Sequence, residues 1–472
     1  MKQFLIVLFL GISFSFNTKA QQLSIKKGII VDSLQVNDSI PESFALYLPQ
    51  KFDTNSPWPV LFVFDLKGRG RQALRMFQEV AEKQGYVLAA PNNVNDSLSI
   101  SENVIKANRV FNRVFSLFPI HKNRVYTAGF SNSARFASII PTFIKGISGV
   151  VAVGGGIPNT EILSNKSPFY FIGIVGNEDY NYTEMLLEEK IMSKIRFPNK
   201  LLVFDGGQQW PKPAHLNKAL EWLRLHAIAK GRAPKDSMFI KNSFDQNLKE
   251  VNTLVNSGKL LAAEDLLSDV LDIYGVHLGI DSLKEKKRTL KKQKLYKSLK
   301  RSENNALFKE SLIKDDFIYY LEEDILTHNF NNLGWWNYQM QELKKYENGP
   351  NQALQRMGKR LQSYVNALVE DNIDLTVSET VIDYEALNFL WMLKTITAPK
   401  DYSYYLKIIS LSSENEDFGT ALFYLEELLK QGYKNKEELY ALEHTALFKI
   451  TPEFNKTVAK YLEGARYDIN EE

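Results

Sequence analysis

Short apolar runs alternate with longer amphipathic stretches along residues 28–228. Several runs are apolar throughout and rich in β-branched or aromatic residues, as expected for strands that are covered on both faces. The runs are GIIV, SFALYLP, VLFVFDL, YVLAAPNN, RVYTAGF, GVVAVGG, FYFIGIVG and LLVFDGG. Helical spacing predicts helices over 72–84, 101–117, 133–144, 182–195 and 215–230. This alternation predicts an α/β fold, a mostly parallel sheet flanked by helices, with its site at the carboxyl ends of the strands.

The pattern changes after residue 230. Residues 231–237 are polar and contain Gly and Pro, which is typical of a linker. From 238 to 472 helical spacing dominates. The segments NSGKLLAAEDLLSDVLDIYG and NEDFGTALFYLEELLKQGY each place a polar turn before Ala and Leu at helical positions. We therefore expect an α/β domain over 21–230 and an all-α, repeat-like domain over 238–472. The helical domain is similar to tetratricopeptide-type repeats, with a generic helical bundle as the alternative.

Residues 1–20 predict an export signal. Lys2 precedes the apolar stretch FLIVLFLGISFSF, and Thr18-Lys19-Ala20 offers a cleavage site. A retained membrane anchor is the alternative, although the run is shorter than the roughly 18–20 residues that a span needs. The chain has no cysteine, so no lipid-bearing cysteine can follow the signal. We expect a periplasmic or secreted protein that is not a lipoprotein and has no transmembrane span after cleavage.

Net charge argues against nucleic acid as a partner. The whole chain carries +3, and removal of Lys2 and Lys19 with the signal leaves 3 − 2 = +1. A nucleic-acid-binding protein usually shows a strong basic excess, and this chain does not.

The motif with the clearest chemical meaning is Gly129-x-Ser131-x-Ser133, at a predicted strand–turn–helix junction. A tight turn of this kind lifts a serine hydroxyl clear of the sheet. The helix that follows places backbone N–H groups where an oxyanion would form. Gly129 allows the close turn, and residue 133 must be small. The alternative is an ordinary turn that happens to contain a serine.

Five segments together resemble the α/β-hydrolase family, in particular its secreted esterase branch with polyhydroxybutyrate depolymerases and feruloyl esterases. The resemblance covers roughly residues 40–228. Its segments are PVLFVFDLKGRG, AEKQGYVLAAPNN, RVYTAGFSNSARFAS, IVGNEDYNYTEM and FDGGQQWP. It implies that Ser131 is the nucleophile and Asp179 the acid, with Glu178 a less favoured substitute. It also implies backbone N–H donors to the oxyanion, one from the loop Leu66, Lys67 and Gly68 and the other from Asn132.

The chain departs from the family pattern at two positions. Gln208 stands where the family has its histidine, and Ser133 replaces the usual glycine. A neutral amide cannot accept the serine proton and return it, and loss of the histidine costs on the order of a millionfold in turnover. His215 is the candidate for a relocated base, with a solvated or capping residue as the alternative. No pair of histidines has metal-ligand spacing, so we expect no metal and no cofactor.

Two further features each have a plain interpretation and a functional one. The segment Lys284–Arg301 carries ten basic residues and one acidic residue. It is either a solvated helix face or a contact for an anionic envelope surface or an acidic partner. The cluster Trp335-Trp336-Asn337-Tyr338 either packs between helices or forms a platform for a ligand or partner.

These observations support three hypotheses. In the first, the protein is an exported pseudo-hydrolase. Its α/β domain binds an ester-like or carbohydrate-linked ligand or an envelope protein, and its helical domain is an interaction scaffold. In the second, it is a serine carboxylic-ester hydrolase that uses Ser131 and Asp179 with His215 or a partner's group as base. A purely structural role for the helical half is the third.

Overall fold

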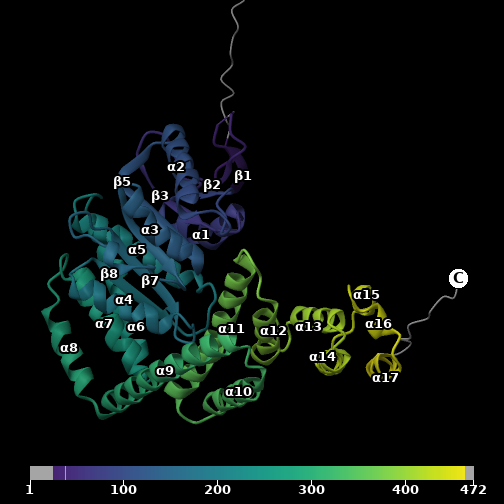
Figure 1. The fold of residues 1–472 in the computed structure, drawn as a ribbon. Coiled ribbons are helices and arrows are strands. Elements are labelled where there is room, and N and C mark those ends of the chain that lie inside the picture. The colour runs from purple at the N-terminus through teal and green to yellow at the C-terminus, as the bar shows by residue number, and fades with distance from the viewer. Residues whose placement is uncertain (1–24, 38, 463–472) are drawn as a thin grey trace, which may run out of the picture.

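The computed structural model describes residues 25–37 and 39–462 (Figure 1). The export signal expected over residues 1–20 lies outside these ranges. Within them, the first half folds around one eight-stranded sheet of order β1-β2-β4-β3-β5-β6-β7-β8. The pairs β1–β2 and β2–β4 are antiparallel and the other pairs are parallel. The strands are β1 (Ile30–Gln35), β2 (Ser43–Tyr47), β3 (Trp58–Phe64), β4 (Val87–Pro91), β5 (Ile120–Phe130), β6 (Ile147–Val153), β7 (Tyr170–Gly176) and β8 (Asn199–Phe204).

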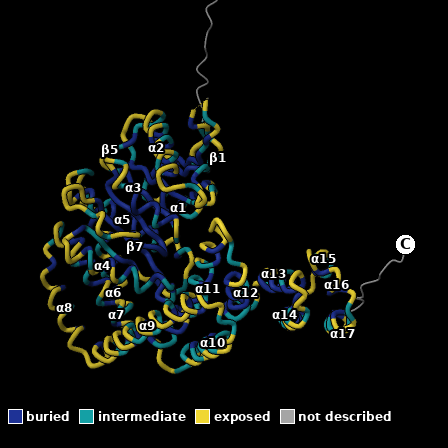
Figure 2. The backbone as a smooth tube through the Cα atoms, in the orientation of Figure 1, coloured by how far each residue is buried: buried dark blue, intermediate teal, exposed yellow. Residues whose placement is uncertain are grey.

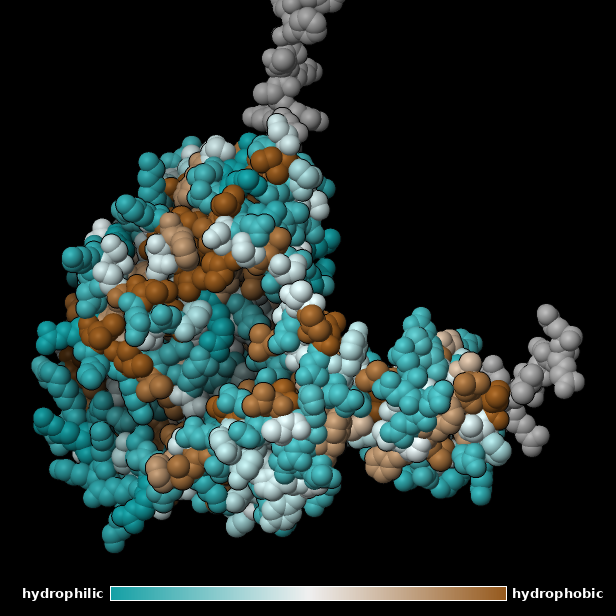
Figure 3. Space-filling model, in the orientation of Figure 1, coloured by the Kyte–Doolittle hydropathy of each residue, from teal (hydrophilic) through white to brown (hydrophobic). Residues whose placement is uncertain are grey.

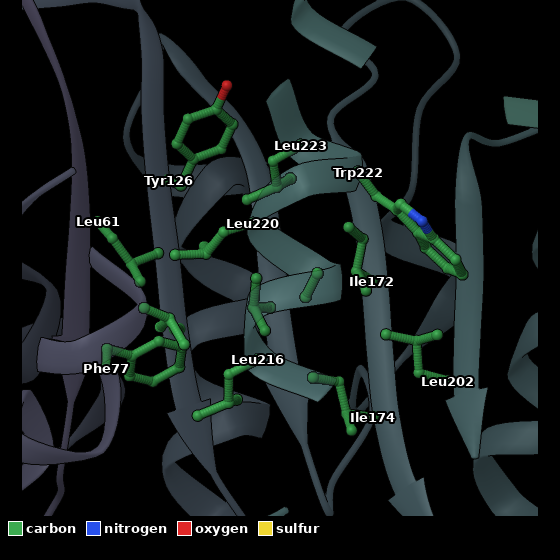
Figure 4. Close-up of a cluster of buried hydrophobic side chains, with 14 of the residues drawn as sticks. Leu61, Phe77, Tyr126, Ile172, Ile174, Leu202, Leu216, Leu220, Trp222 and Leu223 are labelled. Carbon is green, nitrogen blue, oxygen red and sulfur yellow. The ribbon is translucent and has the colours of Figure 1, made fainter. Parts of the chain in front are cut away.

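Helices cover both faces of this sheet. Alternate residues of β3 point to opposite faces, so that Leu61 and Val63 belong to one apolar cluster and Phe62 to the other. On the first face, Leu216 and Leu220 of α5 lie between the strands and α1 (Figure 4). The second face is covered by α2 and α3. The helices are α1 (Gly70–Gln84), α2 (Ile100–Leu117), α3 (Asn132–Phe143), α4 (Tyr182–Lys194) and α5 (Pro213–Ala229), with a short turn of 3₁₀-helix at Thr160–Ile162. The predicted α/β fold, a mostly parallel sheet flanked by helices, is confirmed.

The predicted elements differ from the observed ones mainly at their ends. Strand β5 begins at Ile120, before the predicted run 124–130, because Ile120 pairs with Trp58 beyond a register shift. Helix α5 begins at Pro213, two residues before the predicted start, and proline suits the first turn of a helix, where its missing N–H has no acceptor. Phe64 pairs with Gly129, and Phe130 with Val153. Strands β3, β5 and β6 therefore end at one edge of the sheet.

In the described residues after 204 every regular element is helical. Helices α6 and α7 pack as a hairpin across the predicted turn at 256–258, and α13 packs on α14. Figure 1 shows α13–α17 projecting away from the α/β part. The helices are α6 (Ser237–Asn256), α7 (Leu260–Tyr274), α8 (Asp281–Lys292), α9 (Lys294–Thr327), α10 (Leu333–Glu347), α11 (Gln352–Ser378), α12 (Tyr384–Thr397), α13 (Tyr402–Glu414), α14 (Phe418–Lys430), α15 (Lys436–Ala441), α16 (Ala446–Lys449) and α17 (Pro452–Tyr461), with a 3₁₀ turn at Phe330–Asn332.

Helix α9 does not fit a regular repeat array. It has 34 residues, which is about the length of a whole two-helix tetratricopeptide unit. The all-helical architecture is confirmed, while the likeness to tetratricopeptide repeats stays a prediction for the two hairpins. None of the helices in the described ranges is both long and apolar enough to cross a membrane.

The two halves share one apolar core. Ile240 and Val251 of α6 and Leu267 of α7 belong to the same buried cluster as Leu220 and Leu223 of α5. The polar segment 231–237 therefore connects helices that pack on one another.

The aromatic cluster at residues 335–338 is partly buried and partly exposed. Trp336 is fully buried and donates from Nε1 to Asp324 Oδ2 at 2.8 Å, whereas Tyr338 is exposed.

Candidate active site at the carboxyl ends of the strands

Ser131 lies on the sharp turn between β5 and α3. Its backbone has φ 53° and ψ −125°, a sparsely populated conformation for any residue with a side chain. Two glycines make room for the turn. A Cβ added to Gly129 would lie 2.2 Å from the carbonyl oxygen of Ser133, and one added to Gly155 would lie 2.6 Å from that of Ser131. The strain and the close packing are those of a nucleophile elbow.

Gln208 lies directly beside the Ser131 hydroxyl. Its Nε2 is 3.1 Å from Ser131 Oγ and 2.8 Å from the hydroxyl oxygen of Tyr180. The loop after β8 is fixed by Trp210, whose ring stacks on Phe130 with centroids 5.0 Å apart. The structure thus brings Gln208 and Ser131 together, as the sequence predicts. Tyr180 was not among the predicted site residues, although its position next to Asp179 could have suggested it.

Asp179 is a buried acid with one unused oxygen. The residue is 1% exposed, and its Oδ1 accepts a hydrogen bond of 2.9 Å from the backbone N–H of Asn181. Its Oδ2 is buried and has no hydrogen-bond partner among the described residues. Burial raises the pKa of this carboxyl to about 6. Among the described residues, neither Tyr180 nor Gln208 donates a side-chain hydrogen bond to Asp179.

The three predicted loop donors of the oxyanion site already have acceptors. The N–H of Leu66 donates to Ser133 Oγ at 2.9 Å. The N–H of Lys67 donates to Asp65 Oδ1 at 2.9 Å, and the N–H of Gly68 donates to the Asp65 carbonyl at 2.9 Å. The Ser133 hydroxyl is therefore the group that occupies the N–H of Leu66.

The second predicted donor is Asn132, the first residue of α3. A first-turn N–H has no acceptor within its own helix, so this N–H points out of the helix end beside Ser131. The elbow therefore offers one N–H from α3 to a ligand, while the three predicted donors of the loop after β3 are occupied.

His215 lies away from the Ser131 hydrogen bonds. It is in the first turn of α5, where its ring packs against Phe204 with centroids 5.6 Å apart. Burial and then the nearby charge of Lys218 lower its pKa. No hydrogen bond joins His215 to Ser131 in the part of the chain that the structure describes, and the place beside the hydroxyl is taken by Gln208.

Helices α9 and α11 of the second half donate hydrogen bonds to the loop that carries Asp179. We call this loop the acid loop (residues 177–181). Arg360 of α11 is fully buried and donates from Nη1 to the carbonyl of Asn177 at 2.6 Å. Its Nε and Nη2 donate to Glu310 of α9 at 2.6–3.1 Å. Lys314 of α9 donates to the Tyr180 carbonyl at 3.2 Å. The geometry of the acid loop thus depends on contacts with residues more than 130 positions away.

A polar pocket of about 300 Å³ lies where the two halves meet. Its walls come from the ends of β7 and β8 and from the first turns of α11. Figure 3 shows the face of the molecule hollowed, with a largely hydrophilic lining, between the α/β part and the helices below it. The lining residues are Asn177, Glu178, Asp205, Gly206, Gln352, Gln355 and Arg356. Gly206, one of the lining residues, belongs to the loop that carries Gln208.

Comparisons with known proteins find likeness at the level of structure alone. No family model and no curated protein matches the chain. An S-formylglutathione hydrolase from Staphylococcus aureus is 13% identical, with a TM-score of 0.34, over 43% of this chain and 99% of its own. An esterase from Pyrobaculum calidifontis is 10% identical, with a TM-score of 0.35, over 44% of this chain and 88% of its own. A variant feruloyl esterase module from Clostridium thermocellum is 13% identical, with a TM-score of 0.33, over 43% of this chain and 90% of its own. At such identities the likeness is one of fold and does not extend to activity.

Proposed function

We propose that this protein is an exported pseudo-hydrolase, in which the α/β half binds a ligand or partner at the Ser131 site without hydrolysing it efficiently. The observation that carries the proposal is the hydrogen bond from Gln208 Nε2 to Ser131 Oγ. A base at this place would accept the serine proton. An amide, in either orientation, neither takes up a proton near neutral pH nor gives it back.

Two further observations support loss of catalysis. Asp179 Oδ2 has no donor in the described residues, so nothing uses the acid to orient a base. The N–H of Leu66 is bonded to Ser133 Oγ and is not free for an oxyanion. Removal of a single oxyanion donor lowers turnover about 10²–10³-fold. A base and an oxyanion donor would both stabilise the same transition state, and under this proposal the site lacks both.

The same contacts suit recognition of an acceptor oxygen. Ser131 Oγ takes its hydrogen bond from Gln208, so its own proton is available to a ligand. The N–H of Asn132 is a second donor on the same side of the turn. A carbonyl or hydroxyl oxygen of an ester-like or carbohydrate-linked ligand could receive both bonds without being attacked. The helical half then serves as the interaction scaffold, in the periplasm or outside the cell.

A serine esterase is the second candidate. The observation that favours it is the strained backbone of Ser131, because strain of this kind usually persists where a function requires it. In this case the loop that follows β8 moves, and His215 or a group from a partner then acts as the base.

Hydrolysis of a short-chain activated ester, such as p-nitrophenyl acetate, separates the two candidates. The variants Ser131→Ala and His215→Ala are compared with the unchanged protein. Under the first proposal all three proteins show the same weak background rate. Efficient turnover that disappears in both variants would contradict the first proposal and support an esterase that uses a relocated base. Sequencing of the exported protein's N-terminus, expected at Gln21, tests the export signal.

A further inference from the structure

Helix α9 has one buried face and one exposed face. Its inner face packs on the rest of the helical half and includes Ala306, Phe317 and Leu321. The outer face is exposed along its length, as the yellow positions of α9 in Figure 2 show. Every seventh residue along this face forms a row, which we call the α9 stripe. The α9 stripe consists of Lys294, Arg301, Phe308, Asp315 and Glu322.

The α9 stripe is apolar at its centre and oppositely charged at its two ends. Phe308 is 67% exposed, and Leu312 and Tyr319 beside the row are 50% and 59% exposed. An exposed phenylalanine flanked by further apolar side chains is a common sign of an interface. The ion pairs of α9 are made by its inner face, through Glu310 and Lys314.

The charges of the α9 stripe have no ion-pair partner among the residues that the structure describes. In the described ranges no ion pair includes Lys294, Arg301, Asp315 or Glu322, and all four are exposed. Their order is symmetric about Phe308. The two cations precede it by 14 and 7 residues, and the two anions follow it by 7 and 14. At a rise of about 1.5 Å per residue, these steps are roughly 10 and 21 Å along the helix.

We propose that two copies of this chain associate through the α9 stripe, as an antiparallel helix pair about a two-fold axis at Phe308. In such a pair, residues equally far from Phe308 on either side lie opposite one another. Arg301 then faces the partner's Asp315, and Lys294 faces the partner's Glu322. Phe308 packs on its own copy at the axis. One patch that complements itself in this way is what an isologous dimer requires.

Charge complementarity favours a second copy of the chain over other partners for the α9 stripe. A parallel pair would set Lys294 and Arg301 against the same residues of the partner, and like charges opposite one another are unfavourable. An anionic surface would attract the basic end of the α9 stripe but repel Asp315 and Glu322 at the other end. Of these three arrangements, the antiparallel second copy is the one that pairs both ends with opposite charges.

The interface rests on one helix from each chain, so it falls at the small end of specific interfaces, below about 1,200 Å² in total. We therefore expect a weak dimer that forms as concentration rises. Its exposed ion pairs should make it sensitive to salt, because the Debye length falls from about 30 Å at 0.01 M to about 10 Å at 0.1 M ionic strength.

A charge exchange tests the pairing. In Arg301→Glu, the new carboxylate faces the partner's Asp315, and in Asp315→Arg, the new guanidinium faces the partner's Arg301. Each variant alone should be monomeric in sedimentation equilibrium at low salt. An equimolar mixture places opposite charges at both contacts and should recover the dimer, as should the double variant. A monomeric unchanged protein, single variants that dimerise as it does, or a mixture that stays monomeric would overturn the proposal.

A cysteine cross-linking experiment tests the register of the proposed helix pair. The chain contains no cysteine, so Phe308→Cys introduces a single thiol at the proposed axis. Mild oxidation should link two such chains efficiently. Leu326→Cys is the matched control, since Leu326 lies on the same face and is 78% exposed but would face residue 290 of the second copy. Equal cross-linking of both variants, or none at 308, would contradict the antiparallel pair, and circular dichroism checks that each variant is folded.

Discussion

Replacing Gln208 with histidine should give this protein an esterase activity that depends on Ser131. The amide nitrogen of Gln208 is 3.1 Å from Ser131 Oγ, which is hydrogen-bonding distance for a ring nitrogen in its place. We expect Asp179 Oδ2, which is buried and without a partner in the described residues, to accept a hydrogen bond from the other ring nitrogen. Its carboxyl has a pKa of about 6. Asp179 is therefore ionised above that pH, where the imidazole must also be neutral to act as a base.

The expected gain in kcat is limited by the oxyanion donor that the site still lacks. The histidine of a serine triad is worth on the order of 10⁶ in turnover. A missing oxyanion donor lowers turnover about 10²–10³-fold, and Leu66 is not free to donate. We therefore expect Gln208→His alone to raise kcat by about 10³–10⁴, which is about 4–5 kcal/mol of transition-state stabilisation.

The same reasoning predicts a further gain from a second substitution. Ser133→Ala removes the hydroxyl that accepts from Leu66 N–H and leaves a side chain small enough for the turn. In the Gln208→His background it should raise kcat by about another 10²–10³. In the unchanged protein it should do little, because no base is present to start the reaction.

The assay is p-nitrophenyl acetate hydrolysis at about pH 8, where the imidazole is neutral and Asp179 is charged. The control Gln208→Asn keeps the amide and should stay at background. Ser131→Ala in the Gln208→His background should abolish the gain. A gain that survives loss of Ser131, or one that also appears in Gln208→Asn, would refute the assignment of Gln208 to the place of the base. A fall in kcat on adding Ser133→Ala would refute the role given to Leu66.

Three further predictions concern stability. Arg360→Ala leaves the buried Glu310 with only the 3.5 Å ion pair to Lys314 and should lower the free energy of unfolding in urea by about 3 kcal/mol; a change below about 1 kcal/mol would contradict this. Burial raises the pKa of Glu188 to about 8, so the folded protein holds this proton more tightly than the unfolded chain does. Its stability should therefore fall as pH rises from about 4.5 through 8. Glu188→Gln should remove that part of the fall, on the order of 5 kcal/mol, and an unchanged slope of stability between about pH 5 and 9 would count against it. Ser131→Gly relieves the left-handed backbone at the elbow and should raise the melting temperature, with a gain of about 1 kcal/mol, whereas a loss would show that the hydroxyl stabilises the turn.

Local patterns were sufficient to predict the sheet and the elbow. The buried parallel strands carry apolar residues on both faces, so each appears in the sequence as a continuous apolar run. The turn at Ser131 needs small residues at fixed positions, and these are visible as Gly129 and Ser133. The position of Gln208 beside Ser131 is expected from the resemblance of FDGGQQWP to the α/β-hydrolase segment that carries the histidine, and the loop after the last strand does lie at the same edge of the sheet.

Contacts between distant residues could not be predicted in this way. The bond between Leu66 N–H and Ser133 joins residues 67 positions apart. The bond from Arg360 to the Asn177 carbonyl spans 183 positions, and nothing in either local sequence indicates the other. His215 stayed a candidate base because its distance along the chain from Gln208 is short. The sequence does not reveal that its ring packs on Phe204 instead.

Helix α9 lies between the outer surface of the molecule and the serine. Its inner face carries Lys314, which donates to the backbone of Tyr180, and the Tyr180 hydroxyl in turn receives the amide of Gln208 beside Ser131. Binding free energies are reciprocal across such a connection. If occupancy of the serine site moves α9, it must change the dissociation constant of the dimer, and dimerisation must change the affinity of the site by the same factor. A protein with these two coupled sites would report ligand concentration as a change in assembly.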